Sequence, residues 1–345
     1  MTIDPDFLSE FLVGLLQIPS PTGDTEHGIA FVEAALGALG IKTSRTRKGA
    51  LVATVPGKSD TAPRGVTAHV DTLGAMVKDI RPNGRLTLSQ LGSYAWNTIE
   101  GENVTISTHA RGLVRGTVQP VQASVHVHGA MVGEAKRDAS NLEVRLDTRT
   151  ASAAETGALG IGVGDFVYLD PRVETINGFV KSRHLDDKAG VACVVAAIQA
   201  VLNANLTPAQ TTILHFSNYE EVGHGASAGF PPDLAELLTV DMAAIGQGQA
   251  SDEFHCTLCV KDSGGPYSLD FNRRLRQIAQ GNALDLKTDI YPSYGSDGEA
   301  LWRAGADVQV ALVGPGVDAS HGYERTHRDA LVDTARLIGY YLLTG

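Results

Sequence analysis

Acidic residues and histidines stand at five separate places in the chain, and each place lies at or beside a predicted strand end. They are His69 with Asp71, Asp186 with Asp187, Glu220 with Glu221, Asp241, and His321. Imidazole nitrogen and carboxylate oxygen are the donors that zinc and similar divalent metals accept. A site with two metals also needs an unligated carboxylate nearby to move protons. The chain offers both kinds of group.

His69 and Asp71 follow the predicted strand 65–70 and are two residues apart, so their side chains point to the same side. That side is the crevice beyond the carboxyl ends of the strands, where α/β proteins bind ligands. His69 would bind a metal while Asp71 orients its ring from behind. A polar strand end in a turn is the alternative explanation.

Two pairs of adjacent acids allow a structural and a chemical interpretation. Asp186 and Asp187 open a predicted helix, where they could act as cap and first-turn charges. Alternatively, the two oxygens of Asp186 bridge two metals while Asp187 holds the loop or a ligand in place. Glu220 and Glu221 repel each other on a turn unless cations lie close. One of them could bind metal while the other stays free as general base and then general acid.

Asp241 and His321 complete the set of candidate ligands. Asp241 closes the apolar strand segment 237–240, and His321 lies in a glycine-rich loop after the predicted strand 308–313. Both therefore fall at the edge of the sheet that the other candidates share.

Apolar spacing and turn residues predict the elements that position these groups. An opening helix has Asp4 as its N-cap and Pro5 in its first turn. Helix 25–39 and strands 51–55 and 65–70 follow. After Gly178 the chain alternates between helices 187–203, 268–281, 297–304 and 327–343 and strands 211–217, 237–243, 256–260, 286–290 and 308–313. Such alternation indicates an α/β fold, a mostly parallel sheet with helices on both faces.

Between these halves the pattern changes to short alternating segments with turn signals. They lie at 76–81, 85–89, 103–107, 113–118, 124–128, 143–147 and 165–169. This spacing predicts a small inserted β-barrel-like domain. The predicted organisation is a discontinuous catalytic domain, 1–73 plus 179–345, interrupted by an insertion, 74–178, with an expected role in oligomerisation or substrate access.

Composition excludes several classes of function. The 345 residues favour two domains, and the net charge of −11, from 28 basic and 39 acidic residues, argues against nucleic acid or an anionic membrane as a partner. The start of the chain lacks the features of a secretory signal, so the cytoplasm is the expected location. Cys256 and Cys259 form an isolated C-x-x-C, which we interpret as buried strand residues.

Six segments in one order resemble the TET-type dimetal aminopeptidases, metallopeptidase family forty-two, whose members also carry glutamyl aminopeptidase and cellulase labels. The resemblance covers nearly the whole chain. The chain as a whole is also similar to a subgroup associated with synthesis of a dipeptide osmoprotectant. The segments are 69–77, 159–165, 185–190, 220–223, 294–297 and 320–324.

The resemblance implies a role for each candidate residue. Asp186 would bridge the two metals, with Glu221 and His321 completing one and Asp241 and His69 the other. Glu220 would be the general base. The implied fold is zinc-exopeptidase-like, and the implied assembly is a homo-oligomer, commonly a tetrahedral dodecamer. His184 departs from the family pattern, which expects a small residue there, and this puts substrate preference in question.

We therefore predict a metal-dependent aminopeptidase that hydrolyses the N-terminal bond of short peptides through a water shared by two metals. Zinc is the first expectation for the two divalent ions, and cobalt or manganese also suits the ligands. An alternative is a dimetal hydrolase of N-acyl or amide bonds in a small metabolite or dipeptide osmolyte. A third possibility is a non-catalytic assembly protein on the same scaffold.

Overall fold

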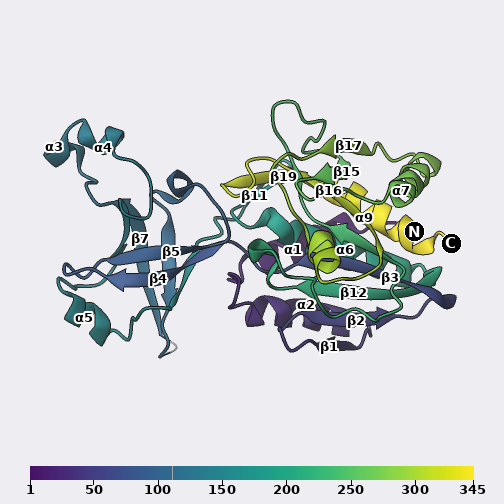
Figure 1. The fold of residues 1–345 in the computed structure, drawn as a ribbon, viewed down its shortest axis with the longest axis horizontal. Helices are drawn as coiled ribbons and strands as arrows, with labels where there is room; N and C mark the ends of the chain where they lie inside the picture. The colour runs from purple at the N-terminus through teal and green to yellow at the C-terminus, as the bar shows by residue number, and fades with distance from the viewer. Residues whose placement is uncertain (111) are drawn as a thin grey trace. The chain divides into compact units, whose positions relative to one another are not determined.

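The computed structural model describes residues 1–110 and 112–345, which form two compact units. The first unit comprises Met1–Asp71 and Arg172–Gly345, and the second comprises Thr72–Pro171. Both chain termini belong to the first unit (Figure 1). The described residues include no helix with both the length and the hydrophobicity to cross a membrane.

A ten-stranded sheet forms the centre of the first unit. Its order is β1-β2-β12-β3-β13-β18-β15-β16, with β14 beside β18 and β17 beside β15. The middle four strands, β12, β3, β13 and β18, are parallel, so their carboxyl ends meet at one edge. The strands are β1 (Thr43–Arg45), β2 (Leu51–Val55), β3 (Ser59–His69), β12 (Gln210–Ser217), β13 (Glu236–Val240), β14 (Ala243–Ala244), β15 (Cys256–Asp262), β16 (Gly265–Pro266), β17 (Lys287–Ile290) and β18 (Gln309–Val317).

Helices cover both faces of this sheet, which confirms the predicted fold class. Along β13, Leu238 packs into one apolar cluster with α1, α2, α6, α7 and α9, while its neighbour Leu237 packs into another with α8. This alternation follows from the two-residue period of a strand. The helices are α1 (Pro5–Leu16), α2 (Glu26–Ala38), α6 (Leu185–Asn203), α7 (Leu269–Gly281), α8 (Asp297–Arg303) and α9 (Arg328–Leu343).

Local sequence explains how two of these helices form. Asp4 caps α1 as predicted, because its carboxylate accepts from the backbone N–H groups of Asp6 and Phe7. Helix α6 is buried along nearly its whole length, so it lacks a polar face and reads as one apolar run. It is the central helix of its layer.

A small antiparallel sheet of β10 (Glu174–Ile176), β11 (Phe179–Ser182) and β19 (Glu324–His327) also belongs to the first unit. Asn177 and Gly178 join β10 to β11 with φ of 52° and 85°, the left-handed pair that a tight hairpin requires. Residues 172–178, which the sequence placed in the insertion, belong to the first unit, and 174–176 among them pair with β11.

The second unit is a closed six-stranded barrel in the order β4-β5-β8-β7-β6-β9, as expected for the insertion. Alternate side chains fill its interior, among them Val77, Leu88, Val104 and Val167. Its strands and helices are β4 (Gly74–Ile80), β5 (Leu86–Leu91), β6 (Asn103–Ser107), β7 (Leu113–Pro120), β8 (Leu142–Leu146), β9 (Phe166–Leu169), η1 (Trp96–Ile99), α3 (Val125–His128), α4 (Met131–Glu134) and α5 (Ala153–Ala158).

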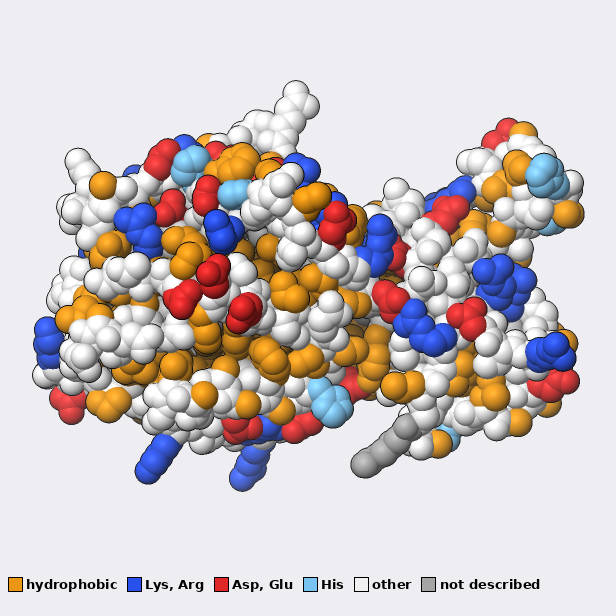
Figure 2. All heavy atoms as spheres, turned by 180° about the vertical axis from the view of Figure 1, so that it is seen from behind, with side chains coloured by type: hydrophobic (Ala, Val, Ile, Leu, Met, Phe, Trp, Pro, Cys, Tyr) orange, Lys and Arg blue, Asp and Glu red, His pale blue; other side chains and the backbone are white. Residues whose placement is uncertain are grey.

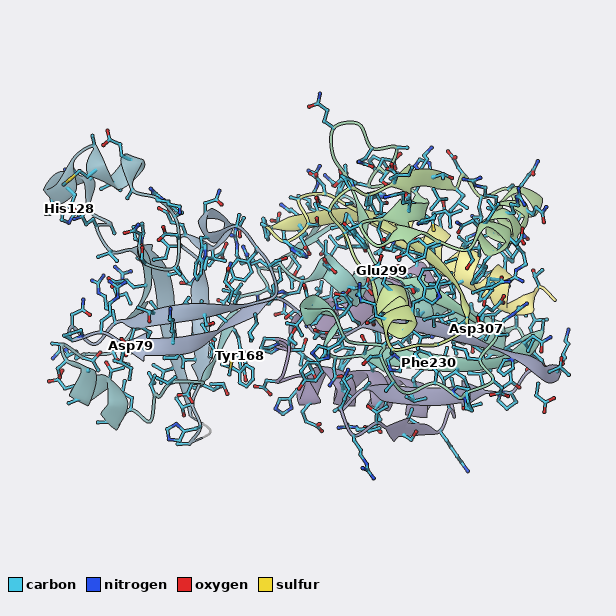
Figure 3. The ribbon with its side chains drawn as sticks, in the orientation of Figure 1. Asp79, His128, Tyr168, Phe230, Glu299 and Asp307 are labelled. Carbon is cyan, nitrogen blue, oxygen red and sulfur yellow. The ribbon has the colours of Figure 1, made fainter. Side chains whose placement is uncertain are left out.

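The strand predicted at 124–128 is wrong, because these residues form the short helix α3. Its backbone bonds are local: the N–H of His128 donates to the Ser124 carbonyl at 2.9 Å. Valine and histidine alternate here as in a strand, but Val125 and Val127 are both exposed. His126 and His128 consequently share a helical turn rather than one strand face, and histidine and hydrophobic side chains gather on this tip (Figures 2 and 3).

A buried ion-pair network holds the amino end of the parallel strands. Arg64 of β3 lies opposite Glu236 of β13, and its Nε is 2.7 Å from Glu236 Oε1 with both side chains almost fully buried. Arg274 contacts the other carboxylate oxygen, and the Tyr341 hydroxyl donates to Glu236 at 2.9 Å. One carboxylate therefore joins two strands to α7 and α9.

We expect Glu236→Ala to destabilise the protein by about 3–5 kcal/mol, because it leaves Arg64 buried without its anion. Urea unfolding would measure the loss. The matched control is Asp270→Ala, which breaks an ion pair with Arg273 in which both side chains are mostly exposed. Its free energy of unfolding should change little. Equal losses in the two variants would contradict this account of the network.

Candidate dimetal site

The parallel strands bring the predicted residues together at their carboxyl edge. His69 is the last residue of β3, and Ser217, its register partner on β12, is followed closely by the 3₁₀ turn η2 (Glu220–Val222). Asp241 follows β13 directly. His321 comes from the loop between β18 and β19, and Asp186 from the start of α6.

Two groups of potential metal ligands form at this edge. His69, Glu220 and Asp241 make one group, and Asp186, Glu221 and His321 make the other, with ligand atoms within 4.8 Å of one another in each. Asp186 also reaches the first group: its Oδ1 is 3.1 Å from His69 Nε2, and its Oδ2 is 3.2 Å from His321 Nε2. One carboxylate thus faces a histidine of each group.

The donor set fits divalent metal ions. Among the described residues, Glu221 Oε1 and Asp241 Oδ1 are buried without a hydrogen-bond partner. Buried carboxylate oxygens are normally satisfied, and a bound cation would satisfy these two atoms. Carboxylates and imidazoles in this mixture suit zinc, cobalt or manganese.

At the start of α6, Asp186 and Asp187 make different contacts. Neither residue has helical dihedral angles, so regular helix begins after them. The Asp187 carboxylate accepts from the Gly190 N–H at 3.1 Å, as a cap would, and from the His69 N–H at 3.2 Å. Asp187 therefore joins the helix to the end of β3 and leaves Asp186 facing the two histidines.

Asp71 contacts both the His69 ring and the turn that carries the glutamates. His69 Nδ1 lies 2.8 Å from the backbone carbonyl of Asp71 and 3.6 Å from its carboxylate. The carboxylate instead accepts from the backbone N–H groups of Glu220 (3.1 Å) and Glu221 (3.3 Å) and from the Thr22 hydroxyl (2.6 Å). Asp71 thereby orients both the imidazole and the turn that carries the two glutamates.

Glu324 hydrogen-bonds to two of the candidate ligand segments, and the sequence reasoning assigned no role to its side chain. Its buried carboxylate accepts from the Asp186 N–H at 3.1 Å and from the His321 N–H at 3.0 Å. His321 has a φ of 62°, in the left-handed region that residues with a Cβ adopt at a cost, and this bond holds it there. The available signal was an acid three residues after a candidate ligand.

Charge crowding shifts the pKa values of the acids in opposite directions. Burial and the nearby Asp186 charge raise the pKa of Glu221 and of Asp241 to about 8. Burial opposes ionisation of Asp186 too, but hydrogen bonds with His321 and His69 outweigh it and lower the pKa. Burial would lower the pKa of His69, whereas its bonds to Asp186 and Asp71 raise it well above the usual value.

Cys256 and Cys259 form no joint site. Cys256 packs into the apolar cluster on one face of the sheet and Cys259 into the cluster on the other. Both thiols are free and buried. The interpretation of this pair as buried strand residues is confirmed.

Comparisons with known proteins agree with the geometry. The sequence profile described as M42 glutamyl aminopeptidase matches residues 49–337. "Putative aminopeptidase YhfE" of Bacillus subtilis (strain 168) is 46% identical over 334 residues, covering 96% of each chain.

Solved structures share the fold at low sequence identity. A TET aminopeptidase from a marine sediment Thaumarchaeota archaeon superposes with a TM-score of 0.88 at 17% identity, covering 97% of this chain and 96% of that one. The Pyrococcus horikoshii TET1 peptidase, which can assemble into a tetrahedron or a large octahedral shell, has a TM-score of 0.84 at 20% identity, with 98% and 100% covered.

We expect the metal-free protein to lose stability as the pH rises from about 5 to 8. Glu221 and Asp241 titrate near pH 8 when folded but at about 4 when unfolded, so the folded state binds more protons in this range. The lowered pKa of Asp186 acts in the opposite direction, but only at pH values below that of an ordinary aspartate.

Thermal unfolding after chelation would measure this effect. The Tm should be lower at pH 8 than at pH 5.5, added zinc should remove most of the difference, and Asp241→Asn should reduce it because one titrating group is lost. A metal-free Tm that rises with pH over this range would contradict the prediction.

Proposed function

The chain belongs to the M42 glutamyl aminopeptidase family, a family of hydrolases acting on peptides, and we propose that it removes N-terminal residues from short peptides with two divalent metal ions. The observation that carries the proposal is the shared carboxylate of Asp186, whose two oxygens face His69 and His321. His69 and Asp241 would hold one ion, Glu221 and His321 the other, and Asp186 both. Zinc is the first candidate.

When bound, such ions polarise the scissile carbonyl and lower the pKa of the attacking water. The remaining steps fall to the chain's own groups. The pKa of Glu220 is well above the usual value, because burial and the negative charges of Asp241, Asp297 and Glu221 oppose its ionisation, although His69 acts the other way. Once ionised, this carboxylate would accept the water proton and pass it to the leaving amine.

The surroundings of Glu220 support this proposed role. Its Oε2 lies 3.9 Å from His69 Nε2, and its side chain keeps some access to solvent, unlike His69 and Asp186. The Asp71 carboxylate accepts from the Glu220 N–H and so fixes the main chain of the turn. The Glu220 side chain would then reach the reacting atoms without a movement of its main chain.

An aminopeptidase acts on a free α-amine, a cation that an acidic pocket would attract. The notable excess of carboxylates at this edge supports that substrate class over a blocked one. A panel of aminoacyl-p-nitroanilides and unblocked tripeptides, assayed beside N-acetylated dipeptides, would test it. Turnover restricted to the acetylated substrates would replace the proposal with an N-acyl hydrolase.

We expect Glu220→Gln to lower kcat by about 10²- to 10⁴-fold, the usual contribution of a general base. Bound metal per subunit should stay at the wild-type value in this variant and fall in Glu221→Gln. Elemental analysis and steady-state kinetics on the same preparations would separate the two roles. Full activity in Glu220→Gln, or turnover that resists chelators, would overturn the mechanism.

We also propose that the barrel unit, Thr72–Pro171, joins copies of this chain into a homo-oligomer, as the insertion was expected to do. The shell formed by the Pyrococcus horikoshii peptidase supports assembly, and the exposed Val125, Val127 and Met131 offer apolar surface for it.

Light scattering after size exclusion would measure the state of assembly. The wild type should elute as a homo-oligomer, and a double change of Val127 and Met131 to Asp should yield smaller species. A wild type that is monomeric at micromolar concentration would contradict the proposal.

A further inference from the structure

A buried carboxylate outside the ligand set lies beneath the turn that carries Glu220 and Glu221. Asp297, the first residue of α8, is 2% exposed. One of its oxygens accepts from the Ala226 N–H at 2.8 Å, and the other accepts a short hydrogen bond from the Ser217 hydroxyl. Neither bond lies within α8, so this acid serves another part of the chain.

The two partners of Asp297 bracket the glutamate turn. Ser217 is the last residue of β12, Ala226 follows the turn, and both glutamates lie between them. The Asp297 carboxylate therefore joins the two ends of the loop that carries the glutamates. Asp71 fixes its middle by accepting from both glutamate N–H groups.

Close packing shows that the loop has little freedom above Asp297. A Cβ added at Gly225 would lie 2.3 Å from Asp297 Oδ1 and 2.9 Å from the Glu220 nitrogen. Only glycine fits between the carboxylate and the turn. On the outer side, Lys48 Nζ donates to the Gly225 carbonyl at 3.3 Å and to the Ser227 hydroxyl at 3.1 Å.

We propose that Asp297 is a positioning residue for the general base, which holds Glu220 in place through its hydrogen bonds to Ser217 and Ala226. This inference rests on the proposed aminopeptidase function. Catalysis is sensitive to the placement of a proton-transfer group, and a shift of about 1 Å can cost about 10²-fold in rate. Loss of these two hydrogen bonds should therefore lower kcat and leave KM less affected.

The test compares three variants of the full-length protein at saturating zinc. Asp297→Ala removes both bonds, while Asp297→Asn can accept from Ala226 and donate to Ser217, which keeps the bracket without its charge. The matched control is Asp289→Ala. Asp289, on the edge strand β17, also combines a serine hydroxyl with backbone donors: it accepts from the Ser251 hydroxyl and from the N–H groups of Ala250 and Ser251.

We expect Asp297→Ala to lose about 10²-fold in kcat with KM changed less than about threefold, and Asp297→Asn to recover most of that loss. Asp289→Ala should lower the Tm while keeping wild-type kcat. The inference fails if Asp297→Ala and Asp289→Ala have the same kcat, or if Asp297→Asn is as slow as Asp297→Ala. If Asp297→Ala does not fold, Ser217→Ala, which removes one bond, must show the smaller kcat loss. A wild type without metal-dependent aminopeptidase activity would instead refute the proposed function.

Discussion

Repulsion between buried carboxylates is the constraint that shapes this protein. Asp186, Glu220, Glu221 and Asp241 lie within a few ångströms of two histidines, in surroundings where an unpaired negative charge is costly. Protons or cations must offset these charges, which is why Glu221 and Asp241 have pKa values of about 8 while Asp186, between His69 and His321, is held ionised. The main chain must keep the groups together in spite of their repulsion.

A second layer of acids meets this requirement through backbone hydrogen bonds. Asp71 holds the glutamate turn, Asp187 joins β3 to α6, and Glu324 joins the Asp186 and His321 segments. Each of these carboxylates accepts from two N–H groups on segments that carry ligands. Because the strand ends leave such N–H groups without sheet partners, the acids satisfy the backbone and fix the ligands in a single set of contacts. The apolar clusters on both faces of the sheet and the Glu236 network at its other end stabilise the fold independently of this edge.

The sequence could predict the fold class and the residues that meet at the sheet edge, because both depend on local periodicity. His69 and Asp241 end apolar strands, and parallel strands bring their carboxyl ends together. It could not predict the role of Glu324 or Asp297. Glu324 accepts from the Asp186 N–H, 138 residues away, and Asp297 from the Ala226 N–H, 71 residues away, and acceptance from a backbone N–H leaves no mark on the partner's residue type. The same limit applies to Asp71, whose backbone carbonyl contacts the His69 ring. The error at 124–128 has the opposite cause. Valine and histidine alternate there as they would in a strand, but the segment is a short helix and contributes no strand to the barrel.

The proposed metal ligand Glu221 and the proposed base Glu220 are consecutive residues, and this has a physical consequence. Glu221 and Glu220 are joined by one peptide bond, and their N–H groups share the carboxylate of Asp71. An ion bound to Glu221, as proposed, would therefore restrict Glu220 as well, so that occupation of the site and alignment of the proposed base would be one event. Asp71, Asp297 and Lys48 hydrogen-bond to this turn and its flanking residues. Under the proposed roles, a loose turn would weaken metal binding and proton transfer together, and a rigid one would support both without further ordering at the moment of reaction.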